Sequence, residues 1–231
     1  MREQLGLRHD TRLLDLVGQG CGAALPNLQT AATLIAARQA RYVLSVCVEV
    51  CSAAFYLDDD PGVLISACLF GDGAAAAVLG MDAPPEGPRL RWVDSVSFCS
   101  PSHRDALRFE QRGGMLRNLL SPQVPEVAAD FAHRVLQQAL EKTGLKRAQI
   151  RRWILHAGGR DVLEALRTRL RLADADVQAS RETLRGFGNL SSPFVLFVLE
   201  RTLRESPAPG YWWLASFGAG FSSHGAILEM C

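Results

Sequence analysis

Cys21 lies in a glycine-rich turn, and its surroundings are those of a reactive thiol. The apolar run at residues 13–17 is long enough for a buried strand, and residues 23–40 have the composition of a helix. The thiol would then stand at a helix N-terminus, where partial positive charge and free N–H groups lower the pKa of a cysteine. The alternative is a buried structural cysteine, because free cysteine is often buried. Small neighbours are expected to leave room for a substrate beside the sulfur, namely Gly20, Gly22, Ala23 and Ala24.

A cysteine nucleophile needs a proton acceptor, and the oxyanion that forms on attack needs hydrogen-bond donors. His156 ends an apolar run and is followed within three residues by two glycines, which predicts an exposed imidazole with room around it. Asn189 stands in a loop rich in Gly and Ser, residues 186–192, that enters a helix. Taken singly, the histidine could be a buried structural residue and the asparagine a helix cap. Together, the glycine-flanked Cys21, His156 and Asn189 favour a catalytic site.

The elements that must position these residues alternate between strands and helices. Residues 41–50 are β-branched and almost continuously apolar, which is typical of a strand at the centre of a parallel sheet. Residues 74–79 indicate another buried strand, and residues 63–70 a short helix that follows a turn at residues 58–62. The three prolines within residues 81–88 mark the clearest internal boundary.

The same alternation continues beyond that boundary. Residues 99–121 are expected to be irregular, with a turn at Gly113 and Gly114. The remaining pattern predicts strands at residues 90–98, 153–155, 211–216 and 225–229, and helices at residues 124–143, 160–172 and 190–203. The predicted fold class is therefore α/β with mixed sheets.

Length, charge and cysteine usage bound the class of protein. A chain of 231 residues can bury a substantial core, in one large domain or two small ones. The net charge of +1 gives no electrostatic argument for a nucleic acid or a membrane surface as partner. The six cysteines lack the spacing of a zinc site, and residues 1–5 contain no apolar signal core. We therefore expect a reduced, cytoplasmic protein without a metal site.

Five motifs occur in the order and at the spacing of a known family. They are Gly20-Cys21-Gly22-Ala23-Ala24, Ala67-Cys68-Leu69-Phe70-Gly71-Asp72-Gly73-Ala74-Ala75, His156-Ala157-Gly158-Gly159, Gly186-Phe187-Gly188-Asn189-Leu190-Ser191-Ser192 and Phe217-Gly218-Ala219-Gly220. Over essentially the whole chain, they closely resemble type III polyketide synthases, the chalcone-synthase-like branch of the thiolase superfamily. Related ketoacyl-carrier-protein synthases usually read His-Gln-Ala-Asn at the histidine, so the Gly-Gly form favours the type III branch. Ala157 is a departure, since the family usually has proline there.

The resemblance implies a layered α/β/α/β/α fold and a role for each motif. Cys21 would carry the acyl group, while His156 and Asn189 would bind the thioester carbonyl, promote malonyl decarboxylation and stabilise the enolate. Phe70 would gate the mouth of the pocket, for which an ordinary core aromatic is the alternative. Further substrate-binding positions would be Cys51, Ala54 and Ser191. The implied substrates are an acyl-CoA starter and malonyl-CoA, bound by a homodimer that uses no cofactor.

The resemblance also implies a long segment before the cysteine turn, whereas only residues 1–20 precede Cys21. The sequence is therefore expected to be the C-terminal portion of a synthase, with an incomplete first thiolase-like half at residues 1–80 and a complete second half at residues 81–231. Strand edges left exposed in this way would invite pairing with another chain. Two functions stay open: a synthase or a part of one, and a non-catalytic remnant or partner subunit that keeps the fold for association.

Overall fold

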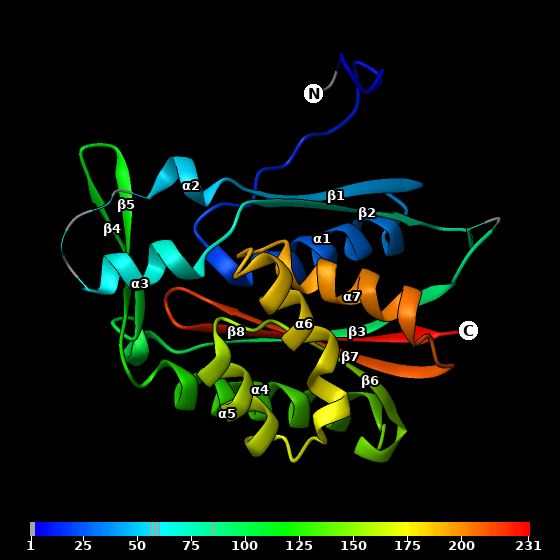
Figure 1. Cartoon of the computed structure of the whole chain (residues 1–231). Helices are drawn as coiled ribbons and strands as arrows, with labels where there is room; N and C mark the ends of the chain where they lie inside the picture. Colours follow the sequence, from blue (N-terminus) through cyan, green and yellow to red (C-terminus); the bar gives the residue numbers. More distant parts are fainter. Residues whose placement is uncertain (1–2, 56, 58, 60, 85) are drawn as a thin grey trace.

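The computed structural model describes residues 3–55, 57, 59, 61–84 and 86–231. Figure 1 shows the elements stacked in layers, with a two-stranded sheet above two helices, a four-stranded sheet beneath them, and further helices below. The helices α1 (Ala24–Ala36) and α7 (Phe194–Glu205) lie between the sheets and contact both. Each sheet thereby buries an apolar face against helices, and the α/β class with mixed sheets is confirmed.

The four-stranded sheet forms the centre of the core. Its strands follow the order β3 (Leu90–Cys99), β8 (Ser222–Met230), β7 (Gly210–Gly218) and β6 (Ile150–Leu155). β8 is antiparallel to both of its neighbours, whereas β6 and β7 are parallel, so the sheet is mixed. β7 lies inside the sheet and is buried along most of its length, which fixes the frame on which the site is built.

Helices cover the lower side of this sheet (Figure 1). α4 (Val124–Thr143) has Pro125 in its first turn, where the missing N–H costs nothing, and ends at Gly144, which is left-handed with φ of 69°. α5 (Arg160–Arg169) packs against α4. α6 (Gln178–Phe187), a helix that the sequence pattern did not indicate, contacts both α5 and α7.

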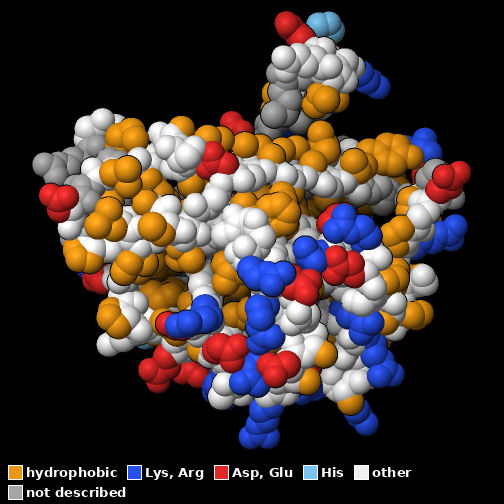
Figure 2. Space-filling model, in the orientation of Figure 1, with side chains coloured by type: hydrophobic (Ala, Val, Ile, Leu, Met, Phe, Trp, Pro, Cys, Tyr) orange, Lys and Arg blue, Asp and Glu red, His pale blue; other side chains and the backbone are white. Residues whose placement is uncertain are grey.

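The two-stranded sheet pairs β1 (Tyr42–Glu49) with β2 (Gly73–Gly80) in antiparallel register. Both predicted strands exist, but the expectation of a parallel-sheet centre is wrong. Alternation turns one face towards α1 and the other to solvent, where Leu44, Val48 and Val78 are exposed. Figure 2 shows hydrophobic side chains along this upper rim of the molecule. An apolar sheet face of this kind is typical of a surface that another layer covers.

The segments outside the two large sheets confirm one prediction and correct two others. α2 (Cys51–Ala54) and α3 (Pro61–Leu69) follow β1; α3 confirms the predicted short helix, while residues 58 and 60 of the expected turn lie outside the described residues. Residues 13–17 have no regular secondary structure, are mostly exposed and pair with no strand in the described part of the chain, so they are not a buried strand.

The segment expected to be irregular contains a hairpin. β4 (Leu107–Arg112) and β5 (Met115–Leu120) are antiparallel and are joined by the predicted turn, in which Gly113 and Gly114 have φ of 57° and 83°. Four short 3-10 helices complete the described elements: η1 (Gly20–Gly22), η2 (Pro101–His103), η3 (Arg147–Gln149) and η4 (Asp174–Val177). Among the helices that the structure describes, none is long and apolar enough to cross a membrane.

Candidate active site

Cys21 lies in the 3-10 turn η1, directly before α1. Strand β7 holds this turn from below, because the hydroxyl of Ser216 donates to the carbonyl oxygen of Gly22 at 3.2 Å. Gly218 packs so closely that a Cβ there would stand 2.1 Å from the carbonyl oxygen of Gln19. Only glycine fits this contact, so backbone packing between two distant segments sets the position of Cys21.

The four small residues around the thiol do not all have the role expected of them. Gly20 and Ala23 line a pocket, as a substrate site requires. Gly22 and Ala24 are buried, and a Cβ at Gly22 would meet the ring of His224 at 3.2 Å. For these two residues the small side chain serves close packing against β7 and β8, and the expectation of room for a substrate is wrong.

Burial dominates the electrostatics of Cys21, of which 7% is exposed. Removal from water raises the pKa of its thiol to about 11. Hydrogen bonding by Ser191 opposes this shift, the negative charge of Glu49 adds to it, and hydrogen bonding by Asn189 opposes it. The expectation of a lowered pKa at the helix N-terminus is therefore wrong, since burial outweighs the helix, and the thiol is protonated at neutral pH.

His156 directly follows β6, and its backbone N–H donates to the backbone carbonyl of Ala215 on β7 at 2.9 Å. Its imidazole packs edge-to-face against Phe194 and Phe217, with ring centroids 5.2 and 5.0 Å away. Only 1% of the residue is exposed, so the predicted exposed imidazole is wrong. Burial lowers the pKa of His156 to about 3, and neither ring nitrogen has a hydrogen-bond partner among the described residues. The ring is therefore neutral, with both nitrogens available.

Asn189 lies between α6 and α7 and links the histidine loop to the cysteine. Its side-chain nitrogen donates to the carbonyl of Gly158, two residues after His156, at 3.1 Å. Its side-chain oxygen accepts the N–H of Ser191 at 2.9 Å. The residue is buried, and its amide also influences the thiol of Cys21 by hydrogen bonding. The N-cap of α7 is Pro193, so the alternative of a helix cap does not hold for Asn189.

A pocket of about 570 Å³ opens beside this centre. All four residues expected to bind substrate line it, namely Phe70, Cys51, Ala54 and Ser191. Phe70 packs edge-to-face on Phe55, with ring centroids 5.1 Å apart, and its main chain forms an isolated bridge with Asn189. Ser191 has φ of 56°, a strained value for a residue other than glycine. Because Ser191 both lines the pocket and hydrogen-bonds with Cys21, it connects the pocket to the buried thiol.

Glu49 is a polar residue of this site that the sequence analysis did not single out. It ends β1, lines the pocket, and accepts a hydrogen bond from the hydroxyl of Ser192 at 2.8 Å. Burial raises the pKa of Cys51 to about 12, and the negative charge of Glu49 adds to that shift. The position of Glu49 at the end of an otherwise apolar strand could have indicated its place in the site, since acidic residues are rarely buried without a partner.

The chemistry that this arrangement offers is acyl transfer. The buried thiol of Cys21 interacts with the side-chain amide of Asn189, and Asn189 in turn binds the loop that follows the neutral imidazole of His156. These groups can supply a nucleophile and two hydrogen-bond donors. All six cysteines carry free thiols. Within the described ranges, no group of three His, Cys, Asp or Glu side chains could hold a metal ion.

The sequence matches two families over successive stretches. Residues 101–227 match the family described as chalcone and stilbene synthases, C-terminal domain. Residues 15–97 match 3-oxoacyl-[acyl-carrier-protein (ACP)] synthase III. The first match spans more than half of the chain and contains both His156 and Asn189, whereas the second contains Cys21.

Curated relatives and solved structures agree with these matches. The chain is 34% identical over 236 residues to 3,5-dihydroxyphenylacetyl-CoA synthase from Streptomyces toyocaensis, and 35% identical over 231 residues to the synthase of that name from Amycolatopsis balhimycina. These alignments cover 98% of this chain but only 60% and 62% of the relatives, so the chain spans about three fifths of their length.

Two solved structures superpose on the chain with a TM-score of 0.91 each. One is the C-terminal type III polyketide synthase domain of Steely1, a type I/III hybrid from Dictyostelium, which is 25% identical. The other is 1,3,6,8-tetrahydroxynaphthalene synthase from Streptomyces coelicolor A3(2), which is 27% identical. Each comparison covers 99% of this chain, with 65% of the first structure and 66% of the second. The structural similarity therefore extends over nearly the whole chain and is not confined to the candidate site.

Proposed function

The chain belongs to the chalcone and stilbene synthase family, and we propose that it carries the acyl-transfer centre of a type III polyketide synthase. The reaction is the decarboxylative Claisen condensation of an acyl-CoA starter with malonyl-CoA, with the acyl group held on Cys21. The observation that carries the proposal is the meeting of Cys21 and Asn189 at a buried centre, where Asn189 also binds the loop of His156. The names of the relatives, all of them synthases, support the same class of chemistry.

In the loading step, the sulfur of Cys21 attacks the carbonyl carbon of the acyl-CoA thioester. The thiol proton passes through the imidazole of His156 to the departing CoA sulfur, so CoA leaves as a thiol and an acyl thioester remains on the protein. A neutral imidazole suits this transfer, because one ring nitrogen accepts a proton while the other donates one. Its low pKa, about 3, keeps His156 neutral at physiological pH.

In the extension step, malonyl-CoA loses CO₂, and the electron pair of the broken bond forms the enolate of acetyl-CoA. The side-chain N–H groups of Asn189 and His156 stabilise the negative oxygen in a site from which water is largely excluded. The enolate carbon then attacks the acyl carbonyl on Cys21, and the sulfur leaves as a thiolate. The proposal uses no metal and no cofactor.

Decarboxylation of malonyl-CoA labelled with ¹³C at its carboxylate tests this function, with the released ¹³CO₂ as the readout. Loss of one donor from an oxyanion site lowers the rate by about 10²–10³. We expect His156→Ala and Asn189→Ala to show this loss while their circular dichroism matches that of the parent chain. The matched control is Cys231→Ala, which removes an exposed thiol at the C-terminal residue, outside the lining of the pocket. Near-parental rates in both donor variants would reject the proposed roles.

The exposed outward face of β1 and β2 favours a second candidate function, association with another polypeptide. This face presents Leu44, Val48 and Val78 to solvent, and a two-stranded sheet is marginally stable without further layers. A covering polypeptide would bring an apolar helix stripe or a further strand. Cys21→Ala separates the two functions, since it should abolish acyl transfer and leave association unchanged. A homodimer, a cytoplasmic location and a division into halves at residues 80 and 81 are further proposals of this kind.

A further inference from the structure

The main chain that leads into His156 is anchored by a side chain from a neighbouring helix. β6 is an edge strand, and His156 turns its N–H towards β7. Because backbone groups alternate in direction along a strand, the carbonyl of Leu155 faces the opposite side, where no described strand lies. The hydroxyl of Ser180 on α6 donates to this carbonyl at 2.8 Å, and Ser180 itself is fully buried. One serine thus takes the place of a missing strand neighbour.

The anchor matters because the imidazole has no hydrogen bond of its own among the described residues. Its orientation depends on the two phenylalanine rings and on the backbone from which it projects. Two side chains hold that backbone, Ser180 at residue 155 and Asn189 at residue 158. Asn189 belongs to the proposed oxyanion site, whereas Ser180 lies on the other side of the strand end and takes no part in the chemistry.

We propose that Ser180 is a positioning residue for His156: its hydroxyl fixes the backbone at Leu155, and thereby the direction in which the imidazole presents its nitrogens to the substrate. The catalytic consequence rests on the proposed function. The structural consequence, a single fixed orientation of the ring, does not.

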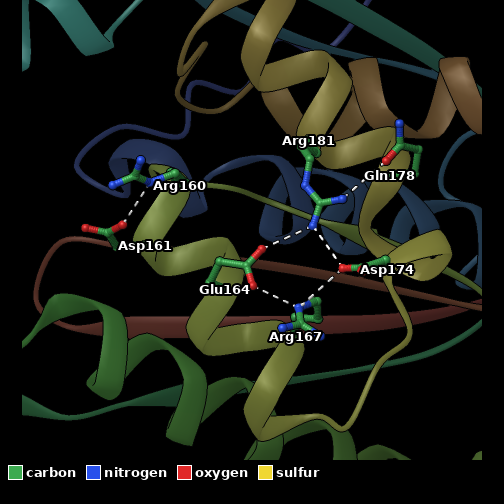
Figure 3. A network of polar contacts seen from close by, with 7 residues as sticks. All are labelled: Arg160, Asp161, Glu164, Arg167, Asp174, Gln178 and Arg181. Carbon is green, nitrogen blue, oxygen red and sulfur yellow. Dashed lines mark hydrogen bonds and ion pairs between the residues drawn. The ribbon is translucent and has the colours of Figure 1, made fainter.

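Figure 3 shows a network of ion pairs around Arg181, the residue that follows Ser180 on α6. Arg181, the next residue on α6, contacts Glu164 of α5 at 3.1 Å and Asp174 of η4 at 3.3 Å. Arg167 binds the same two carboxylates at 2.8 and 3.6 Å, so the four side chains form a closed ring. Single surface ion pairs contribute little, but a network that joins three elements restrains their relative position. α6 is thereby held against α5, the helix that follows the His156 loop.

The test removes the anchor while keeping the helix. Ser180→Ala deletes the hydroxyl, and Ser180→Thr restores one. Thr183→Val is the matched control, because the buried hydroxyl of Thr183 lies on the same helix but donates only to Ala179 within it, at 2.8 Å. Each chain is labelled with ¹⁵N-histidine, and His156→Gln assigns the ring signals.

We expect the parent chain, Ser180→Thr and Thr183→Val to show one sharp set of His156 ring signals, from a neutral ring at pH 5. Ser180→Ala should show several sets or exchange broadening. In the decarboxylation assay, Ser180→Ala should lower kcat by about 10- to 100-fold, with KM for malonyl-CoA changed less than about twofold. If the parent chain releases no CO₂, the proposed function fails, and the ring signals alone decide the positioning role.

A structural role without positioning gives a different pattern. Ser180→Ala and Thr183→Val would then lower the melting temperature alike, with unchanged His156 signals and unchanged kcat, and this outcome would overturn the proposal. If Ser180→Ala does not fold, Ser180→Cys replaces it, because it keeps the size of the side chain and offers only a weak donor. Parental ring signals and kcat in that variant would overturn the proposal equally.

Discussion

The thiol of Cys21 should react slowly in the substrate-free chain, and its rate should climb with pH. With a pKa of about 11, its thiolate fraction at pH 8 is roughly 10⁻³, whereas a free cysteine of pKa about 8.5 is roughly one quarter ionised at that pH. Only the thiolate attacks an alkylating reagent, so Cys21 should react about 200-fold more slowly than free cysteine, before any hindrance from burial. Ser191→Ala should slow it further, because the Ser191 hydrogen bond opposes the rise in pKa.

The assay is alkylation with iodoacetamide between pH 7 and 10.5, read at each cysteine by peptide mass analysis, with N-acetylcysteine as the internal reference. The logarithm of the Cys21 rate should rise with a slope near one per pH unit across this range. Thr183→Val is the control, because the buried hydroxyl of Thr183 donates only to Ala179 within α6. A rate that levels off below pH 9, or a Cys21 that outpaces the reference at pH 7, would refute the argument that burial controls this thiol.

Three further predictions concern stability and association. Because burial lowers the pKa of His156 from about 6.5 to about 3, the free energy of unfolding should be fully retained above pH 6.5 and fall by up to about 5 kcal/mol towards pH 3. Urea titrations should show a smaller loss for His156→Phe, and equal losses would contradict this cause. Gly218→Ala should lower the free energy of unfolding by about 1–3 kcal/mol, because its Cβ would collide with the turn that carries Cys21. The control Gly186→Ala in α6 should leave that free energy unchanged, because its Cβ would meet no other atom. Similar losses in the two variants would contradict the packing argument. Val78→Lys on the outward face of the β1–β2 sheet should lower the apparent mass in light scattering. Ala77→Lys on the inward face of that sheet should instead destabilise the fold. An unchanged apparent mass for Val78→Lys would argue against association through this face.

Elements with local signals at both ends could be predicted from the sequence. The sequence pattern predicts the helix at residues 124–143 with its observed bounds, because Gly144 supplies the left-handed residue that ends it. The strand before His156 and the turn at Gly113 and Gly114 have equally local causes. The run at residues 13–17 fails as a strand for the opposite reason: apolar character is local, but a strand needs a neighbour that the rest of the chain must provide.

The composition of the candidate site could be predicted, but its electrostatics could not. The motifs predict Cys21, His156 and Asn189 as site residues, because glycine-rich turns occur where the backbone approaches other groups closely. Their burial depends on side chains far away in sequence, such as Phe194 and Phe217, which enclose the imidazole that the flanking glycines were expected to expose. Burial, and not the neighbouring residues along the chain, is the main cause of the shifted pKa values of Cys21 and His156.

The central claim is that Cys21 receives the acyl group, and covalent acylation tests it most directly. The chain is incubated with an acyl-CoA, its intact mass is measured, and the modified peptide is then mapped. The account predicts a mass increase of one acyl group, located on Cys21, and no increase for Cys21→Ala. An acyl group on Cys47, Cys51 or Cys99 with Cys21 unmodified, or no acylation of a folded chain, would contradict it.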